Sequence, residues 1–417
     1  MRQVKQALSE TKPGWLILLC MTRVLNATIS TAWAGVLPQV IKEWGLQASQ
    51  AGLVQSAWHV GYLTSLFCVG FIADRVGPRK TFLVGSALTA VASLGFAFGA
   101  RDLTSTALLF GLTGLFAGAC YSPGLQLLAA NAPPEQRGKA MGAFIGSSSL
   151  GYALSLAVVA GLTSMYSWRI ALIAVGLLVT AGAVLTAFAL KRMRADPIRH
   201  RSSPPVSIPS LIMETVRDRP AMAGNWAYAA HCWELLALWA WLPAYLAFCA
   251  GANGLSSAQG LALAAVAHMV SVAGSVVGGA ASDRFGRTRV MMFATCTSLT
   301  CSFAFGWLWS APMWTVAIFG ALYNMCAIAD SSVYSTALAD VVPPERLGVA
   351  FSVRSVLGFG AGAISPWVFG VALDWGHAAM SPPDKSWILA WATVGLGGLI
   401  GPWMILRFSR FSGAIAR

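Results

Sequence analysis

The stretch GFIADRVGPRK at residues 70–80 returns 209 positions later as GAASDRFGRTR at residues 279–289. A second pair of segments, PPEQRGKA at 133–140 and PPERLGVA at 343–350, is separated by 210 positions. Both separations are close to half the length of this 417-residue chain. The sequence therefore predicts an internally duplicated fold, whose two copies run in the same direction and are related by a pseudo-two-fold axis.

The composition places both copies in a membrane. Hydrophobic residues make up 57% of the chain and charged residues only 10%, whereas a soluble domain has about 25% charged residues. A membrane-spanning helix needs about 20 mostly apolar residues, and twelve stretches meet this requirement. We expect an all-α membrane protein with a six-helix bundle at 1–190, a central loop at 191–220 and a second bundle at 221–417. The expected spans are 14–38, 50–73, 80–100, 104–130, 138–162, 168–190, 221–249, 257–281, 289–310, 313–340, 348–373 and 385–407.

The placement of basic residues predicts the orientation. Of the 28 lysines and arginines, four lie in segments on one side of the predicted membrane: Lys42, Arg101, Arg169 and Lys385. Arg23 and Arg354 lie within helices, and the rest fall on the other side. Because cytoplasmic loops collect basic residues, we expect both termini inside, in a cytoplasmic (inner) membrane. The net charge of +13 is then a result of topology and gives no support to a nucleic-acid role. The eight scattered cysteines form no metal-like cluster, and no cofactor is expected.

The repeated loop is also a family signature. Gly70-x-x-x-Asp74-Arg75-x-Gly77-x-Arg79-Lys80 resembles the loop between helices 2 and 3 of the major facilitator superfamily, and 279–289 resembles its second copy. The resemblance implies a transporter of small solutes that is mostly monomeric. It also implies that Asp74 faces the start of helix 11 near Gly348 and latches a gate. Gly70 is expected to let helices pack closely and Gly77 to turn the chain. The alternative is that the basic residues only fix topology. The expected gating residues are Asp74, Arg75, Gly77, Arg79, Asp283, Arg284 and Gly286.

Several ionisable side chains lie inside the predicted spans, where a charge is costly and is kept for function by default. In the superfamily, helices 1, 4, 7 and 10 line the central cavity, which implies that Arg23, Glu234 and Asp330 line it here. Arg23 and Glu234 are 211 positions apart, so we expect them to face each other across the pseudo-two-fold axis. His59, His268 and Arg354 are further candidates. The two histidines are also compatible with packing, and Arg354 with a structural ion pair to Asp330.

Helical spacing groups further polar residues with these charges. Predicted substrate-binding residues follow one face of each of three helices, and they are Arg23, Asn26, Ser30, Trp33, Tyr228, Asn324 and Tyr334. His231 and Glu234, in the stretch AAHCWELLALW at 229–239, share a face of helix 7. The predicted proton-coupling residues are His231, Glu234 and Asp330.

The chemistry of these groups predicts anion transport driven by protons. Arginine stays charged and its fork suits carboxylates. A carboxyl group removed from water exchanges protons near neutral pH, and a neighbouring histidine can share the proton. We therefore expect symport of a proton with a small organic anion by a rocker-switch motion. Helix 1, TRVLNATISTA at 22–32, resembles the anion:cation symporter branch, with Arg23 at the branch position. Thr22, Gly114 and Cys120 stand where that branch has charged residues.

Two alternatives remain at this point. Drug or metabolite efflux by proton antiport fits the length and the loop motif. However, helix 4 has no arginine, and helix 5 lacks the Gly-Pro motif usual in that group. A membrane sensor or scaffold that has lost transport is the second, although such a protein would not need polar residues on several cavity helices. An enzyme is not expected, because no catalytic triad, HExxH or phosphate-binding loop is present.

Overall fold

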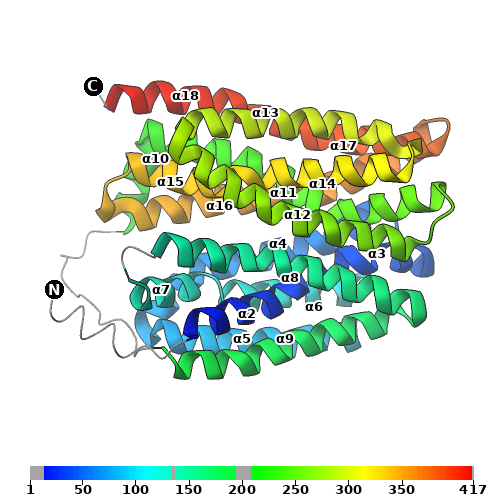
Figure 1. Cartoon of the computed structure of the whole chain (residues 1–417), viewed down its shortest axis with the longest axis horizontal. Helices are drawn as coiled ribbons and strands as arrows, with labels where there is room; N and C mark the ends of the chain where they lie inside the picture. The colour runs from blue at the N-terminus through cyan, green and yellow to red at the C-terminus, as the bar shows by residue number, and fades with distance from the viewer. Residues whose placement is uncertain (1–13, 134–136, 194–207, 416–417) are drawn as a thin grey trace. The chain divides into compact units, whose positions relative to one another are not determined.

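The computed structural model describes residues 14–133, 137–193 and 208–415, and these residues form helices joined by short turns, without a β-strand (Figure 1). Eleven helical segments are long and apolar enough to cross a membrane. At the place of the remaining predicted span lies α4 (Ala48–Val76), a helix of 29 residues. Each predicted span thus coincides with a helix or with consecutive helices, and the all-α membrane class is confirmed.

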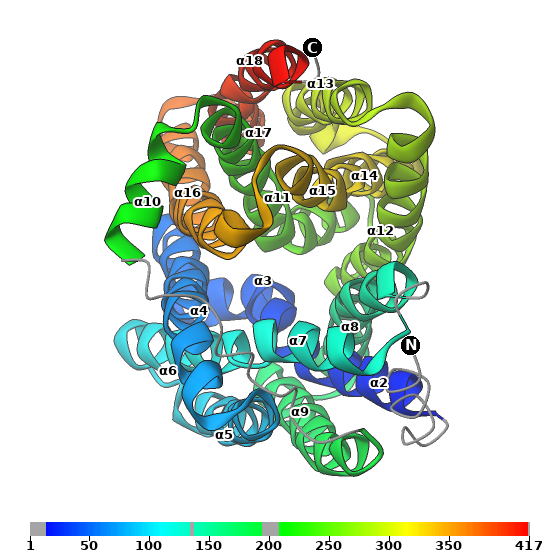
Figure 2. The same cartoon turned by 90° about the vertical axis from the view of Figure 1, so that its left-hand side faces the viewer.

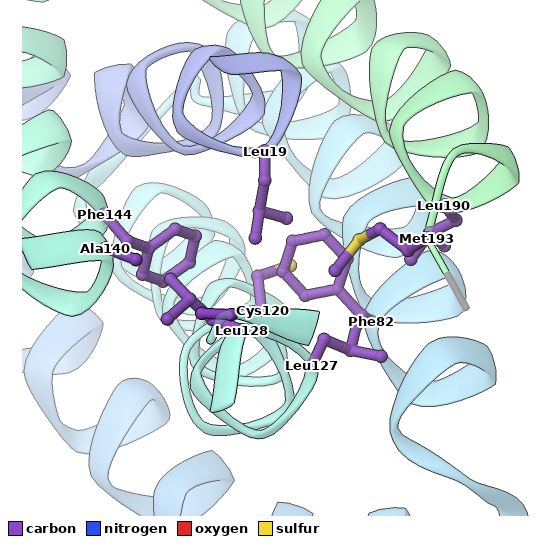
Figure 3. Packing of buried hydrophobic residues seen from close by; sticks show 10 residues of the cluster. Leu19, Phe82, Cys120, Leu127, Leu128, Ala140, Phe144, Leu190 and Met193 are labelled. Atoms are coloured by element: carbon purple, nitrogen blue, oxygen red, sulfur yellow. The ribbon is translucent and has the colours of Figure 1, made fainter. Parts of the chain in front are cut away.

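Residues 14–36 and 60–193 form one compact unit, called here the N-terminal unit. Within it, α5 packs against α6 and α9, and α2 packs against α8 and α9. Figure 3 shows part of its apolar core, in which Leu19, Phe82, Leu128 and Phe144 meet around Cys120. The helices that begin in this unit, or return to it, are α2 (Trp15–Ala27), η1 (Thr28–Thr31), α3 (Ala32–Trp44), α4, α5 (Pro78–Gly99), α6 (Leu103–Gly118), α7 (Ser122–Asn131), α8 (Arg137–Met165) and α9 (Trp168–Lys191).

Residues 37–59 and 208–415 form the second compact unit, called the C-terminal unit. Its helices α11, α12, α14 and α16 pack closely, and α13 packs against α17 and α18. The elements are α10 (Ile208–Arg217), α11 (Arg219–Ala252), α12 (Ser257–Phe285), α13 (Arg287–Phe305), η3 (Gly306–Ser310), α14 (Met313–Ala329), α15 (Ser331–Val341), α16 (Pro344–Ala379), η4 (Pro383–Lys385), α17 (Ser386–Gly398) and α18 (Ile400–Ile415).

Several predicted continuous spans are interrupted in the structure, among them 14–38 by η1 and 385–407 at Leu399, and two of the interruptions correspond in the repeat. The span predicted at 104–130 divides into α6 and α7, with residues 119–121 between them. The span predicted at 313–340 divides into α14 and α15 at Asp330. Cys120 and Asp330 are 210 positions apart, so the two interruptions occupy equivalent places in the repeat. Interrupted helices in corresponding positions of two halves often mark the binding region of a transporter.

The chain between the predicted bundles contains a helix that the sequence analysis did not expect. Part of the predicted loop 191–220 forms α10, which lies beside α16 (Figure 2). Arg346 on α16 contacts two acids at the C-terminal end of α10. It lies 3.5 Å from Asp218 and 3.9 Å from Glu214. Residues 194–207, which carry much of the expected basic loop, lie outside the described residues.

The second departure concerns residues 37–59, which were predicted in the N-terminal bundle and group with the C-terminal unit. Asp374 on α16 accepts hydrogen bonds from the backbone N–H groups of Ala48 (2.7 Å) and Ser49 (2.8 Å) at the start of α4. A Cβ added to Gly52 would lie 2.2 Å from the carbonyl oxygen of Pro366. Gly52, which has no side chain, allows the close approach of α4 to α16, and the Asp374 carboxylate caps the first turn of α4. The rest of the predicted two-bundle division stays a prediction.

Candidate functional site

Arg23 is the buried cation of the N-terminal unit, with 8% of its surface exposed. Its Nε donates a hydrogen bond of 2.8 Å to the Ser148 hydroxyl on α8. The guanidinium carbon lies 5.2 Å from the ring centre of Tyr121 and 5.7 Å from that of Phe144. All ion pairs of the described residues involve His231, Arg287 or Arg346, so no carboxylate there neutralises Arg23. The side chain is a fixed positive charge among hydroxyls and ring faces, which is the chemistry of an anion-binding group.

The other polar residues of the helix 1 stripe have different surroundings. Asn26 donates 2.9 Å to Ser86 on α5, and Ser86 lies 3.1 Å from the Thr186 hydroxyl on α9. Asn26 therefore joins three packed helices, which favours a structural role over the predicted contact with substrate. Ser30 is half-buried and within hydrogen-bonding reach of Tyr152, and Trp33 is fully buried.

Glu234 is the buried acid of α11, and only 4% of it is exposed. Its two oxygens accept hydrogen bonds from Ser302 (2.8 Å) and Ser298 (2.9 Å), both on α13. Ser302 lies 2.6 Å from the Tyr323 hydroxyl on α14, which extends the cluster. Arg23 and Glu234 belong to different units, and their predicted juxtaposition stays a prediction.

His231 contacts a different acid from the one expected. Its Nδ1 lies 3.0 Å from Oδ1 of Asp330, and its Nε2 lies 2.7 Å from the Ser331 hydroxyl. This close pair is an electrostatic contact, because Oδ1 has no aligned hydrogen-bond donor among the described residues. The other oxygen of Asp330 accepts 3.1 Å from Thr295. Residues three apart on a helix point in directions about 60° apart, so His231 reaches the α14–α15 interruption while Glu234 reaches α13.

Arg354 makes no ion pair with Asp330, and the structural salt bridge considered from the sequence is wrong. Its Nη1 donates 2.8 Å to the Ser335 hydroxyl on α15. Its guanidinium carbon lies 4.5 Å from the ring centre of Tyr228 and 4.7 Å from that of Phe351. Tyr228 in turn stacks on the His231 ring at 5.7 Å and packs edge-on against Tyr334 at 5.8 Å. Tyr228 thus separates the second intramembrane arginine from the histidine–aspartate pair.

Three remaining candidates have mainly packing contacts. Asn324 is buried, accepts 3.0 Å from the Trp239 indole and donates 3.2 Å to the carbonyl of Ala267, so both ends of its amide are used inside the protein. His268 lies beside Trp239, with ring centres 6.0 Å apart. His59 lies 3.4 Å from the Gln55 amide and edge-on to Trp58. These contacts favour the packing alternative for both histidines.

The two loop copies share a backbone turn and differ in their side-chain contacts. Gly77 (φ 93°) and Gly286 (φ 89°) have a positive φ that favours glycine, each directly before a helix. Arg79 donates to the carbonyls of Leu190 (2.8 Å) and Met193 (3.1 Å) at the end of α9.

In the second copy the basic residue that pairs is Arg287, which contacts Asp283 and lies 3.3 Å from Asp340. Arg75 and Arg284 are exposed, and the side chain of Asp74 lies outside the described part of the chain. An added Cβ at Gly70 would meet no described atom within 4 Å, so the close packing expected there is not seen among the described residues.

Sequence reasoning missed the residues that surround the charges. They are Tyr62, Tyr121, Phe144, Ser148 and Tyr152 around Arg23, and Thr295, Ser298, Ser302, Tyr323, Ser331 and Ser335 in the C-terminal unit. Ser298 and Ser302 were detectable as two hydroxyls four apart on an apolar helix. Within the described residues no three His, Cys, Asp or Glu side chains gather as a metal ion would require. A shallow depression along α13, lined by Thr288, Met292 and Phe293 among others, includes none of the candidate residues.

Comparison with known proteins assigns the family. The family model described as Major Facilitator Superfamily matches residues 19–366. A probable sulfoacetate transporter of Cupriavidus necator is 26% identical over 87% of this chain and 86% of its own length. A hexuronate transporter of Bacillus subtilis is 24% identical over 88% of this chain and 89% of its own. Among solved structures, an inward-facing bacterial homologue of the human lysosomal transporter Spinster matches with a TM-score of 0.75 at 14% identity. It covers 95% of this chain and 96% of that one, and it supports the fold. The chain therefore belongs to the Major Facilitator Superfamily and is a membrane transporter, not an enzyme.

Proposed function

We propose that the protein transports a small organic anion with a carboxylate-like group together with protons, by alternating movement of its two units. The observation that carries this proposal is the environment of Arg23. A buried guanidinium without a carboxylate partner in the described residues is costly inside a membrane, and an anionic substrate removes that cost. Hydrogen bonds with Ser148 and Tyr62 use part of the five N–H donors of Arg23, and we propose that the substrate takes the others.

The two full-length relatives support the choice of substrate class. Sulfoacetate and hexuronates are both small anions, and each relative matches along nearly its whole length. We therefore take these two compounds as the first candidate substrates. We further propose that the protein works as a monomer in the cytoplasmic membrane, with both termini inside.

The acids of the C-terminal unit support coupling to protons. Glu234 is surrounded by hydroxyl groups, and a hydroxyl can donate to a carboxylate or accept from a carboxylic acid. The site can therefore hold Glu234 in either protonation state with small rotations of Ser298 and Ser302. His231 and Asp330, with Nδ1 and Oδ1 3.0 Å apart, are the other residues that we propose for proton coupling.

Moving the anion and the proton together also lowers the electrostatic cost of transport. An isolated charge in a low-dielectric interior is much less stable than in water, whereas a proton that accompanies an anion reduces the net charge transferred. This lower cost favours symport of the anion with a proton over transport of the anion alone.

The test uses purified protein in vesicles with an imposed pH gradient and radiolabelled sulfoacetate or glucuronate. We expect Glu234→Gln to abolish accumulation driven by the gradient while counterflow of the same anion continues, because exchange needs no net proton movement. Glu43→Gln makes the same chemical change at an exposed acid and should behave like the wild type. Proton-driven accumulation by Glu234→Gln at the wild-type level would remove Glu234 from the mechanism.

A thermal-shift series distinguishes this proposal from drug efflux. We expect sulfoacetate or glucuronate to raise the melting temperature of the wild type and not that of Arg23→Ala. Stabilisation by cationic drugs alone, retained in Arg23→Ala, would overturn the anion proposal and favour antiport of drugs.

A further inference from the structure

The helix α10 exposes an apolar face. Its side chains Ile212, Met213 and Val216 are 38%, 51% and 47% exposed. Successive residues of an α-helix are turned by about 100°, so these three side chains lie within about 100° of one another on one side of the helix. A contiguous apolar patch on the surface of a protein marks a contact with another molecule or with a membrane.

The opposite side of α10 is attached to spanning helices of the same unit. Thr215 is buried, and Arg346 on α16 lies 3.9 Å from Glu214 and 3.5 Å from Asp218. The helix contacts both α16 and α11. Because these contacts fix one side of α10, the helix cannot turn its apolar face toward the C-terminal unit. That face is left for contact with something other than this unit.

The place of α10 in the chain puts it at the level where two spans begin. The helix ends at Arg217, and the spanning helix α11 begins at Arg219. Arg346, to which α10 is attached, is the first residue of the spanning segment Arg346–Ala379. A helix of ten residues is about 15 Å long, whereas a hydrocarbon core is about 30 Å thick, so α10 cannot cross it.

The direction of α10 agrees with this level. The spanning helices α11, α12 and α16 run lengthwise across Figure 1, along the long axis of the view. Figure 2 looks along that axis and shows α10 from its side, next to α16. The helix therefore lies across the spans, as expected for a helix in the plane of a membrane surface.

The charges of α10 are divided between its two sides. Arg217 follows Met213 by four residues, so it lies one turn further along the same side, and it is exposed. Arg219, at the start of α11, is exposed as well. The acid of α10, Glu214, is on the attached side with Arg346. Arginines beside an apolar face lay their alkyl chains along it and reach the phosphates of acidic headgroups.

We propose that α10 is a membrane-surface anchor that binds a bilayer containing anionic phospholipid. The side chains of Ile212, Met213 and Val216 enter the boundary between headgroups and acyl chains, and Arg217 and Arg219 contact the phosphates. The site takes neither substrate nor proton, so it is independent of the proposed function. Through the contact of α10 with Arg346, the anchor ties the beginning of α16 to the lipid surface.

The experiment identifies what lies against each side of α10 in the full chain. The photo-crosslinking amino acid p-benzoylphenylalanine replaces Met213 on the apolar face or, as the matched control, Glu214 on the attached side. The protein is placed in nanodiscs and irradiated, and lipid adducts are counted by mass spectrometry. We expect at least about fivefold more adducts at position 213, because the two side chains point about 100° apart.

The lipid composition tests the charge of the partner. Replacing half of the phosphatidylcholine by phosphatidylglycerol should raise the yield at position 213 by at least about twofold, because basic residues at a membrane surface attract anionic lipid. Arg217→Gln should reduce this gain. Arg407→Gln should leave it unchanged, because Arg407 is an exposed arginine of α18 that stacks on Trp403 at 4.0 Å.

A substitution on the apolar face tests insertion itself. Val216→Asp places a charge in that face and should lower the adduct yield at position 213 at least about threefold, whereas Val216→Leu should keep it. Size-exclusion chromatography checks that both variants are folded. If Val216→Asp does not fold, the comparison of positions 213 and 214 and the Arg217→Gln variant still decide the result, because neither alters Val216.

Each other result overturns the anchor. Equal yields at positions 213 and 214 would mean that the apolar face does not point to lipid, and an absence of adducts at 213 would mean that it faces water. Crosslinks at 213 to a second copy of the chain would make the face a contact between copies. Equal yields in the two lipid mixtures would remove the anionic headgroup from the site. None of these results bears on transport of the anion.

Discussion

The interruptions at residues 119–121 and at Asp330 lie at equivalent places in the repeat and differ in length and in chemistry. Both divide a membrane-spanning segment into two helices, at positions one repeat apart. In the N-terminal unit, Cys120 lies among the apolar core residues of Figure 3. In the C-terminal unit, Asp330 lies 3.0 Å from His231 and accepts a hydrogen bond of 3.1 Å from Thr295. Both halves have a place outside regular helix here, and the side chain at that place differs between them.

The two units also differ in the sign of their buried charges. The N-terminal unit has a buried arginine without an acid near it among the described residues, whereas the C-terminal unit has Glu234 and Asp330, both buried. An acid beside Arg23 would occupy the guanidinium and compete with a substrate anion. The comparison therefore predicts that one half binds the anion and that the other half carries the coupling protons.

Loss of Arg23 is the largest effect expected from this comparison. In Arg23→Gln the anion loses a charged, two-pronged partner, and we expect initial uptake to fall by about a hundredfold or more. Arg23→Lys keeps the charge without the fork and should lose less. The measurement is the initial rate of sulfoacetate or glucuronate uptake into vesicles, with Arg407→Gln as control. A rate above half of the wild type in Arg23→Gln would break the assignment of anion binding to this half.

The equivalent positions 120 and 330 give the next largest effect. Asp330→Asn keeps the shape and removes the ionisable group, so we expect proton-driven accumulation to fall at least about tenfold while counterflow continues. Cys120→Ser, at the corresponding interruption, should stay within about twofold of the wild type. Both are measured with the same pH-gradient assay. Equal losses in the two variants would contradict the difference proposed here between the side chains at the two interruptions.

A smaller effect is expected at the two asparagines that were predicted to touch substrate. Asn324→Ala removes two internal hydrogen bonds and Asn26→Ala one. At about 0.5–1.5 kcal/mol for each bond, the melting temperature should fall in both variants, and more in Asn324→Ala. Ligand affinity should be unchanged in each. A loss of affinity with normal thermal stability would return the residue to the substrate site.

Two helix caps, one in each unit, give the smallest effects. Asp374→Ala removes the carboxylate at the start of α4, and we expect a loss of about 1 kcal/mol in stability. The corresponding test in the N-terminal unit is Asp102, which accepts 2.9 Å from the backbone of Ser105 at the start of α6. Asp374→Asn, which keeps an acceptor oxygen, should lose less than the alanine variant when both are followed by thermal denaturation.

Asp102 also adds a dependence on pH. The backbone N–H of Ser105 holds the pKa of Asp102 below its ordinary value, because the hydrogen bond favours the ionised form. A group whose pKa is lower in the folded state stabilises the fold above its unfolded pKa and loses that contribution as the pH falls through the folded value. We therefore expect the difference in melting temperature between wild type and Asp102→Asn to shrink below about pH 4. A difference that is constant down to pH 3 would exclude this role.

The sequence predicted the spans and the repeat well, because both depend on composition and on motifs that a linear pattern records. It also identified Arg23 and Glu234 as charged side chains within membrane-spanning helices. The partners of the charges could not be predicted, because they depend on which way each helix is turned. His231 contacts Asp330 and not Glu234, and Arg354 contacts Tyr228 and not Asp330. Ser148 and Ser302 look like ordinary small residues of apolar helices until neighbouring helices bring them to a charge.

The contact between Arg79 and the end of α9 has a consequence for the order of events during synthesis. Arg79 precedes its two carbonyl acceptors by 111 and 114 residues, so it leaves the ribosome long before α9 exists. With the orientation predicted from charge, Arg79 first acts as one of the basic residues that keep its loop in the cytoplasm during insertion. Once α9 has been inserted, the same guanidinium closes the end of that helix. Replacing Arg79 with a neutral residue would therefore affect two steps. These are the insertion of the helices on either side of its loop and the capping of α9 after that helix has been inserted.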